Sequence, residues 1–259
     1  MSKLSKQSMD SCGLQIGCPT CVSREQREIN RLKMLHMKKV KINGEYEIIL
    51  PEHRANRPEW YTGLGWEKKR LQSMKEHLTD KDIMFYVGNE EGDMSALLAM
   101  WGVKLGLFEP NPKVWPNTKA IWEANKLPMP LFSFCGFASN QTTEGGMYVG
   151  FPPSAVGEVI GDHGFMELQN HNAPEIKIDD IGIEPTAISI DVEGSEWEVL
   201  KGAKNTLRDH KPKIWLSIHP EFAFRIYGTY SNDLRKWIKD FGYTETIIDY
   251  QHELHVLYV

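Results

Sequence analysis

The most specific chemical signal in the sequence is a pair of carboxylates placed just after an apolar segment. The segment Ala187-Ile188-Ser189-Ile190 has the composition of a buried strand, and Asp191 and Glu193 follow it directly. Open α/β sheets bind ligands in the crevice outside the carboxyl ends of their strands. We therefore predict that Asp191 projects into such a crevice. There it could orient a hydroxyl group and take its proton, hold a divalent cation with Glu193 or Asp180, or only cap the next helix.

A glycine-bearing turn lies earlier in the chain, between an apolar strand and an apolar helix. Its sequence is Tyr86-Val87-Gly88-Asn89-Glu90-Glu91-Gly92-Asp93. Glycines let the backbone turn sharply and approach a ligand, and the N–H groups at the start of a helix can bind an anionic group. The pattern predicts the first half of a nucleotide-type site, although an ordinary strand-to-helix turn would have a similar sequence. The residues expected to contact a cofactor are Tyr86, Gly88, Asn89, Gly92 and Asp93.

Glu109 closes the next apolar strand, 21 residues after Gly88. An acidic side chain about 20 residues beyond a glycine turn commonly binds a ribose. A carboxylate can accept hydrogen bonds from both ribose hydroxyls at once. We therefore predict that Glu109 binds a ribose; the alternative is a surface glutamate at the end of a strand.

Several segments together carry a resemblance to a known family: Asp191-Val192-Glu193-Gly194-Ser195-Glu196, Val199-Leu200-Lys201-Gly202-Ala203, Phe108-Glu109-Pro110 and Ile178-Asp179-Asp180-Ile181. Over roughly residues 40–259 the chain resembles the FkbM-type S-adenosylmethionine-dependent methyltransferases. The resemblance implies a class I methyltransferase fold, a seven-stranded Rossmann-like sheet with an antiparallel last strand. It also implies S-adenosylmethionine as cofactor and O-methylation of a sugar or another small hydroxylated metabolite.

The same resemblance assigns roles to individual residues. Gly88 and Gly92 would face the methionine part of the cofactor, and Glu109 would hold the ribose hydroxyls. Asp191 would lie beside the sulfonium and the acceptor.

Five residues depart from the family pattern. The family usually has an acid at Tyr86, Ala-Asn at Asn89-Glu90, Lys at Ser189 and Glu near Ser217. Without the first acid, the cofactor's ammonium group loses one expected anchor, which Glu90 or Glu91 could replace. These departures support a second hypothesis, a non-catalytic binding or structural protein that retains the fold with a degraded cofactor turn.

His219 ends the predicted strand Lys213–Ile218 at the same edge of the sheet as Asp191. An imidazole titrates near neutral pH, so His219 could act as a general base on an acceptor hydroxyl. Alternatively, it only forms a hydrogen bond with a neighbour.

Three of the four cysteines, Cys12, Cys18 and Cys21, lie close together near the N-terminus. With His36 they could hold zinc, because thiolates and imidazole suit its tetrahedral coordination. The spacing matches no strong zinc motif, and reduced thiols in a tail are the simpler interpretation. No metal site is predicted, although zinc or another divalent cation is chemically compatible with these residues.

The elements that must position these residues alternate between strand and helix from Asp82 onward. The predicted strands are Ile83–Val87, Lys104–Phe108, Leu131–Phe137, Ala187–Ile190, Lys213–Ile218, Thr244–Ile248 and Leu254–Val259. Alternation of this kind favours an α/β fold with a mostly parallel sheet and helices on both faces. We expect three parts: a polar and basic arm (1–37), a hairpin around Asn43-Gly44 with a helix (38–80), and a methyltransferase domain (81–259).

The composition restricts the class of protein and of partner. A hydrophobic fraction of 41% indicates a globular core, and a net charge of −5 argues against a dedicated nucleic-acid-binding protein. No apolar run is long enough to span a membrane, and the N-terminus has no secretory signal. We therefore expect a cytoplasmic protein whose partner is a small-molecule acceptor; its oligomeric state is not predicted.

Overall fold

The computed structural model describes residues 36–57, 67–157, 173–250 and 253–259. The predictions for Cys12, Cys18 and Cys21 and for most of the basic arm lie outside these ranges. His36 is within them; it is exposed, and its Nδ1 lies 3.7 Å from a carboxylate oxygen of Glu52.

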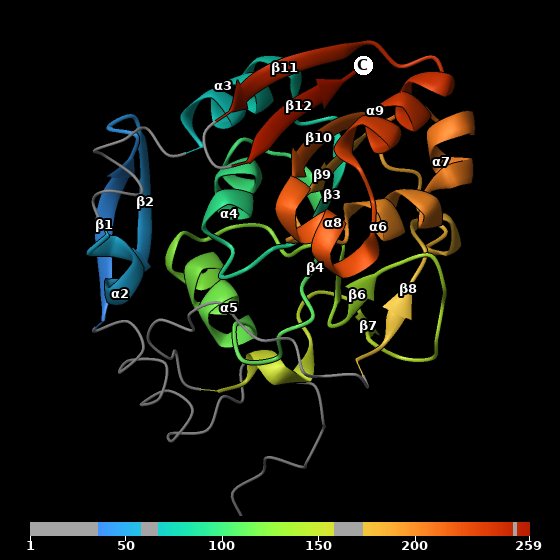
Figure 1. The fold of residues 1–259 in the computed structure, drawn as a ribbon. Coiled ribbons are helices and arrows are strands. Elements are labelled where there is room, and N and C mark those ends of the chain that lie inside the picture. Colours follow the sequence, from blue (N-terminus) through green and yellow to red (C-terminus); the bar gives the residue numbers. More distant parts are fainter. Residues whose placement is uncertain (1–35, 58–66, 158–172, 251–252) are drawn as a thin grey trace, which may run out of the picture.

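An eight-stranded, mostly parallel sheet forms the centre of the protein (Figure 1). In spatial order its strands are β11 (Glu245–Tyr250), β12 (Leu254–Tyr258), β10 (Lys213–Ile218), β9 (Ala187–Ile190), β3 (Ile83–Val87), β4 (Lys104–Phe108), β5 (Phe132–Phe134) and β7 (Met147–Tyr148). β12 is antiparallel to both neighbours, whereas β10, β9, β3, β4 and β5 run parallel. The first seven strands confirm the predicted Rossmann-like sheet with its antiparallel last strand. The short strand β7 adds an eighth at one edge.

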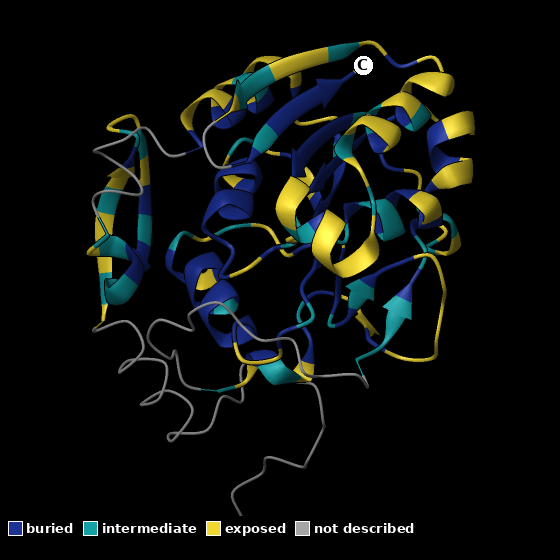
Figure 2. Ribbon diagram, in the orientation of Figure 1, coloured by how far each residue is buried: buried dark blue, intermediate teal, exposed yellow. Residues whose placement is uncertain are grey.

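The central strands are apolar on both faces because helices cover both faces of the sheet. In β3, Met84 and Tyr86 belong to one hydrophobic core, and Phe85 and Val87 belong to the other. The first core includes side chains of α3 (Lys68–His77), α4 (Asp93–Met100) and α5 (Trp115–Ala124), and the second those of α6 (Glu196–Gly202), α7 (Lys204–Asp209) and α9 (Ser231–Asp240). Figure 2 shows the central strands buried between these layers. Within the described ranges, no helix is long and apolar enough to cross a membrane.

The predicted N-terminal hairpin is confirmed as β1 (Met37–Ile42) and β2 (Tyr46–Pro51), followed by α2 (Glu52–Ala55). Its turn requires positive φ at Asn43 (+53°) and Gly44 (+73°), which these residue types tolerate. The backbone of Ile49 exchanges two hydrogen bonds with the Asn125 side chain beside α5, at 2.8 and 2.7 Å. The hairpin is thereby attached to the face of the sheet that α4 and α5 cover.

The prediction of a single strand over Leu131–Phe137 is wrong. The chain leaves the main sheet after β5, and β6 (Phe137–Ala138) pairs instead with β8 (Glu175–Ile176). Gly136 lies at this break, and a Cβ atom there would be 2.2 Å from the carbonyl oxygen of Pro174. The apolar run therefore divides where two backbone segments cross closely, and a propensity pattern cannot detect such a crossing.

The position of β12 decides which residues meet at the carboxyl edge of the sheet. Because β12 is antiparallel to β10, its first residue, Leu254, pairs with Ile218, the last residue of β10. Glu253 and His255 consequently lie beside the ends of β9 and β10. α8 (Pro220–Tyr227) begins at this same edge.

Candidate active site

The glycine turn lies against the loop that carries Asp191. Gly88 has a φ of +88°, and a Cβ atom there would lie 1.7 Å from the carbonyl oxygen of Asp191. Gly92 has a φ of +89° directly before α4, and a Cβ atom there would lie 2.8 Å from the Thr118 side chain. Positive φ and close packing both exclude larger residues here. The two glycines thus allow the turn to pack tightly at the strand ends.

Glu109 is held against this turn by backbone donors. Its Oε2 accepts a hydrogen bond from the N–H of Glu90, and its Oε1 accepts one from the N–H of Asn111, each at 2.8 Å. Burial raises the pKa of Glu109 to about 7, although the two hydrogen bonds act in the opposite direction. The end of β4 and the glycine turn are therefore joined through one carboxylate, which retains lone pairs for a ligand hydroxyl.

Three other side chains predicted to contact the cofactor have partners within the protein. The Asn89 amide donates to Thr118 Oγ1 and accepts a hydrogen bond from Ser95 Oγ. Asp93 forms a buried ion pair with Arg54, with 2.6 Å between Nη2 and Oδ2. Tyr86 is buried in the hydrophobic core. The geometry thus favours a supporting role for these side chains, and the prediction that they bind cofactor directly stays untested.

The two acids suggested as replacement anchors are in different environments. Glu91 is buried; its Oε2 lies 2.6 Å from His53 Nε2 and accepts a hydrogen bond from the Asn117 amide. The Glu90 side chain is 62% exposed, and its Oε2 lies 3.8 Å from Arg54 Nη2. Of the two, Glu90 is the one that solvent or a ligand can reach.

Asp191 follows β9 as predicted and contacts Arg70 of α3. Arg70 Nη1 donates to Asp191 Oδ2 and to Glu67 Oε2, each at 2.8 Å, while Nη2 donates to Ser189 Oγ at 2.7 Å. Burial would raise the pKa of Asp191, but attraction to the Arg70 guanidinium and to His219 holds it below its usual value. Asp191 is therefore ionised at neutral pH.

His219 is surrounded by carboxylates. Its Nδ1 lies 2.7 Å from Glu196 Oε1, and its Nε2 lies 2.5 Å from Glu253 Oε2 and 3.7 Å from Asp191 Oδ1. Burial alone would lower the pKa of His219, but the hydrogen bonds to Glu196 and Glu253 raise it to about 11. In this environment the imidazole is protonated at neutral pH. It then has no lone pair with which to act as a general base.

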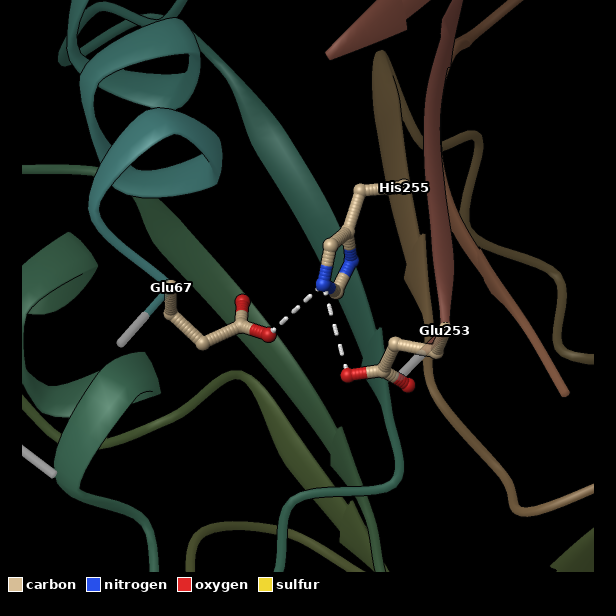
Figure 3. Close-up of side chains that lie close together, drawn as sticks. All are labelled: Glu67, Glu253 and His255. Carbon is tan, nitrogen blue, oxygen red and sulfur yellow. Dashed lines mark ion pairs between the residues drawn. The ribbon is translucent and has the colours of Figure 1, made fainter. Parts of the chain in front are cut away.

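A second histidine lies on the same edge, in β12 (Figure 3). His255 Nε2 is 3.3 Å from Glu67 Oε1 and 3.3 Å from Glu253 Oε1. Its Nδ1 is 2.9 Å from Ser217 Oγ. Burial and the nearby Arg70 lower the pKa of His255 to about 4, so this imidazole is neutral. The two histidines of this edge therefore carry different charges.

Two groups of side chains in the described ranges have ligand atoms close enough to share a metal ion. One consists of Asp191, Glu193 and His219, and the other of Glu67, Glu253 and His255. Asp180, the other suggested metal ligand, instead accepts a hydrogen bond from Thr142 Oγ1 at 2.6 Å.

A family model described as the methyltransferase FkbM domain matches residues 82–245. The chain belongs to the FkbM methyltransferase family. The predicted class I methyltransferase fold is confirmed. The matched region includes the glycine turn, Glu109, Asp191 and His219. It does not include Arg70 or the residues of β12, which lie at the same edge of the sheet.

Comparisons with solved structures return further methyltransferases. The FkbM methyltransferase from Methylobacillus flagellatus KT is 19% identical with a TM-score of 0.49, covering 71% of this chain and 44% of that one, so the match spans less than half of its length. Trm5b from Pyrococcus abyssi is 15% identical with a TM-score of 0.46, covering 86% and 55%. TYW2 from M. jannaschii, in complex with AdoMet, is 12% identical with a TM-score of 0.40, covering 86% and 84%. No curated protein matches this chain.

Arg70 accounts for one departure of this FkbM-family chain from the family pattern. Where a lysine is usual in the strand before Asp191, the chain has Ser189, and the Arg70 guanidinium contacts both residues. The positive charge beside the carboxylate is thus supplied from α3. At Ser217, where an acid is usual, the hydroxyl contacts His255.

The sequence analysis did not identify four residues of this edge: Glu67, Arg70, Glu253 and His255. Glu67 and Arg70 lie at the start of a segment that was predicted only as a helix. Glu253 lies in the predicted polar turn between the last two strands, and His255 lies in the last predicted strand. The only sequence signal was the shared departure of Ser189 and Ser217 from the family pattern. Two small hydroxyl residues at adjacent strand ends leave room for long side chains from elsewhere.

Proposed function

We propose that this FkbM-family chain uses S-adenosylmethionine to methylate a hydroxyl group of a sugar or another small hydroxylated metabolite. The observation that carries the cofactor assignment is the contact between Glu109 and the glycine turn. The Glu109 carboxylate follows β4 and accepts a hydrogen bond from the N–H of Glu90 at 2.8 Å. A carboxylate in this position is suited to accept hydrogen bonds from a ribose diol.

The other cofactor contacts follow from the same edge of the sheet. The backbone at Gly88 and Gly92 would lie along the methionine part, and the exposed Glu90 carboxylate would attract its ammonium group. When bound, S-adenosylmethionine supplies a methyl group on a positively charged sulfur.

Asp191 is the residue we assign to the acceptor. Its ionised carboxylate can accept a hydrogen bond from the acceptor hydroxyl and take the proton as the oxygen–carbon bond forms. Arg70 orients the carboxylate, and protonated His219 adds a positive charge on the other side, so neither acts as the base. The acceptor oxygen must come within roughly 3–3.5 Å of the methyl carbon, which makes positioning the main task of the protein.

A sugar acceptor is supported by the chemistry of this edge. Glu193 is 42% exposed and Asp191 is 24% exposed, so carboxylate oxygens face the solvent beside the glycine turn. Carboxylates accept hydrogen bonds from neighbouring hydroxyls, which a polyol provides.

Calorimetric titration with S-adenosylmethionine and S-adenosylhomocysteine tests the cofactor assignment. We expect micromolar affinity for both, and absence of binding at millimolar ligand would overturn it. Release of S-adenosylhomocysteine in the presence of individual sugars then tests the acceptor class. Binding without turnover on any hydroxylated acceptor would leave the cofactor assignment intact and remove the sugar assignment.

The burial of Tyr86, in place of an acid, favours one second candidate, a binding protein that keeps the fold without catalysis. The same titration separates the two candidates, because a degraded cofactor turn would bind neither ligand.

A further inference from the structure

Three buried side chains from two distant parts of the chain meet beside the proposed acceptor position. Glu67 precedes α3, Glu253 precedes β12, and His255 lies in β12; their side chains are 3%, 6% and 7% exposed. Figure 3 shows the two carboxylates directed at the same ring nitrogen of His255. None of the three belongs to the glycine turn or to the loop of Asp191.

Each of these side chains has its other polar atom held by a residue outside the group. Ser217 Oγ contacts His255 Nδ1 at 2.9 Å, Arg70 Nη1 donates to Glu67 Oε2 at 2.8 Å, and His219 Nε2 lies 2.5 Å from Glu253 Oε2. These contacts orient His255 Nε2, Glu67 Oε1 and Glu253 Oε1 toward a common point. Metal ligands in proteins are typically oriented by such outer contacts.

The two distances from His255 to the carboxylates match metal coordination better than direct hydrogen bonding. His255 Nε2 is 3.3 Å from each carboxylate oxygen. Charge-assisted N–H···O bonds are shorter, about 2.7–2.9 Å. Ligand atoms at about 2.0–2.2 Å from a tetrahedral zinc ion are separated from one another by about 3.3–3.6 Å.

The charge balance around the group also favours a cation. Glu67, Asp191, Glu193, Glu196 and Glu253 contact only two cationic side chains among the described residues, Arg70 and His219. Burial of carboxylates is favoured by compensating positive charge. A dication would supply it.

We propose that Glu67, Glu253 and His255 bind a divalent transition-metal ion of the zinc type. An imidazole nitrogen with two carboxylate oxygens suits zinc, whereas magnesium and calcium prefer all-oxygen ligands. Three protein ligands leave a fourth position of a tetrahedral ion for water or another oxygen. The ion would join α3 to β12 beside Asp191.

Metal binding is measured on the full chain carrying Cys12→Ser, Cys18→Ser and Cys21→Ser, so that the N-terminal thiols cannot contribute. Zinc is titrated calorimetrically, and cobalt is added as a spectroscopic probe. We expect one equivalent of zinc to bind. We also expect visible cobalt absorption without sulfur-to-cobalt charge transfer.

His255→Ala and Glu67→Gln should each weaken zinc binding by at least about 100-fold, because loss even of an outer contact costs 10–100-fold. Glu67→Gln keeps the size of the side chain and serves if His255→Ala does not fold. His210→Ala is the matched control, since that imidazole also lies near a carboxylate, 3.5 Å from Glu184, but is 39% exposed.

Absence of zinc binding in the chain with the three N-terminal cysteines replaced would overturn the proposal. So would unchanged affinity in both ligand variants, or loss of binding only in Asp191→Asn, which would place the ion at the other group of side chains. None of these results depends on S-adenosylmethionine, so failure of the metal site and failure of the proposed methyl transfer remain distinguishable.

Discussion

The cofactor side and the acceptor side of the candidate site are stabilised in different ways. On the cofactor side, Glu109 is held by N–H groups of residues 19 and 2 positions away. On the acceptor side, Arg70 reaches Asp191 and Ser189 over 121 and 119 positions. One side is organised by the local backbone, and the other by ion pairs between elements that only the folded chain brings together.

This difference has a consequence for how each side responds to substitution. Backbone donors remain when a side chain is changed, so loss of Glu109 should affect the ligand more than the fold. Removing one partner of a buried ion pair leaves the other charge uncompensated. Substitutions on the acceptor side should therefore lower both the stability of the fold and the activity.

The largest effect is expected for Asp191→Asn. Asparagine preserves the shape of the side chain but removes its charge and basicity, so methyl transfer should fall by about 10²–10⁴-fold. Turnover is measured with saturating cofactor and acceptor, and cofactor affinity should stay close to that of the wild type. Full turnover in this variant would exclude Asp191 as the base and leave the acceptor side without an assigned catalytic residue.

Arg70→Met should lower the free energy of unfolding by about 3–5 kcal/mol, because it leaves Glu67 and Asp191 without their buried counter-charge. The adjacent Lys69 provides a matched control. Its ion pair with Asp249 has the same N–O distance of 2.8 Å, but the lysine is 63% exposed. Lys69→Met should cost about 1 kcal/mol or less. Equal losses of unfolding free energy in the two variants, measured by urea denaturation, would show that burial of the Arg70 ion pairs does not increase their contribution to stability.

Glu109→Ala should weaken binding of S-adenosylmethionine by about 1.5–3 kcal/mol, the range for hydrogen bonds to a charged group. That is about 10–150-fold in Kd by calorimetry. The circular dichroism spectrum should be unchanged. Affinity equal to that of the wild type would show that Glu109 does not bind the ribose, and would contradict the main assignment on the cofactor side.

A smaller effect is expected from pH. Because burial raises the pKa of Glu109 to about 7, the carboxylate is mostly protonated at pH 6 and mostly ionised at pH 8. The ionised form is the better hydrogen-bond acceptor, so cofactor affinity should rise as pH increases through about 7, by up to about tenfold. Glu109→Gln should abolish this component while retaining any titration of the ligand itself. A pH dependence identical in both proteins would assign it to other groups.

Local sequence was sufficient for most of the sheet and for the positions of the glycine turn and Glu109 at the strand ends. The strands at residues 83–87, 104–108, 187–190 and 213–218 are correctly predicted because each is a short apolar run bounded by turn residues. The class I fold with its antiparallel last strand followed from the family resemblance carried by the Asp191 and Glu109 segments. The break at Gly136 was not predictable, since it depends on contact with Pro174.

The sequence by itself determined that an acid follows β9, that another closes β4, and that a histidine ends β10. Only the tertiary structure decided the charges of these groups and their partners. Antiparallel insertion of β12 beside β10 brings Glu253 to His219, and packing of α3 brings Arg70 to Asp191. The physical reason is that a pKa depends on burial and on neighbouring charges, and those neighbours lie more than a hundred residues away along the chain for Arg70 and Asp191.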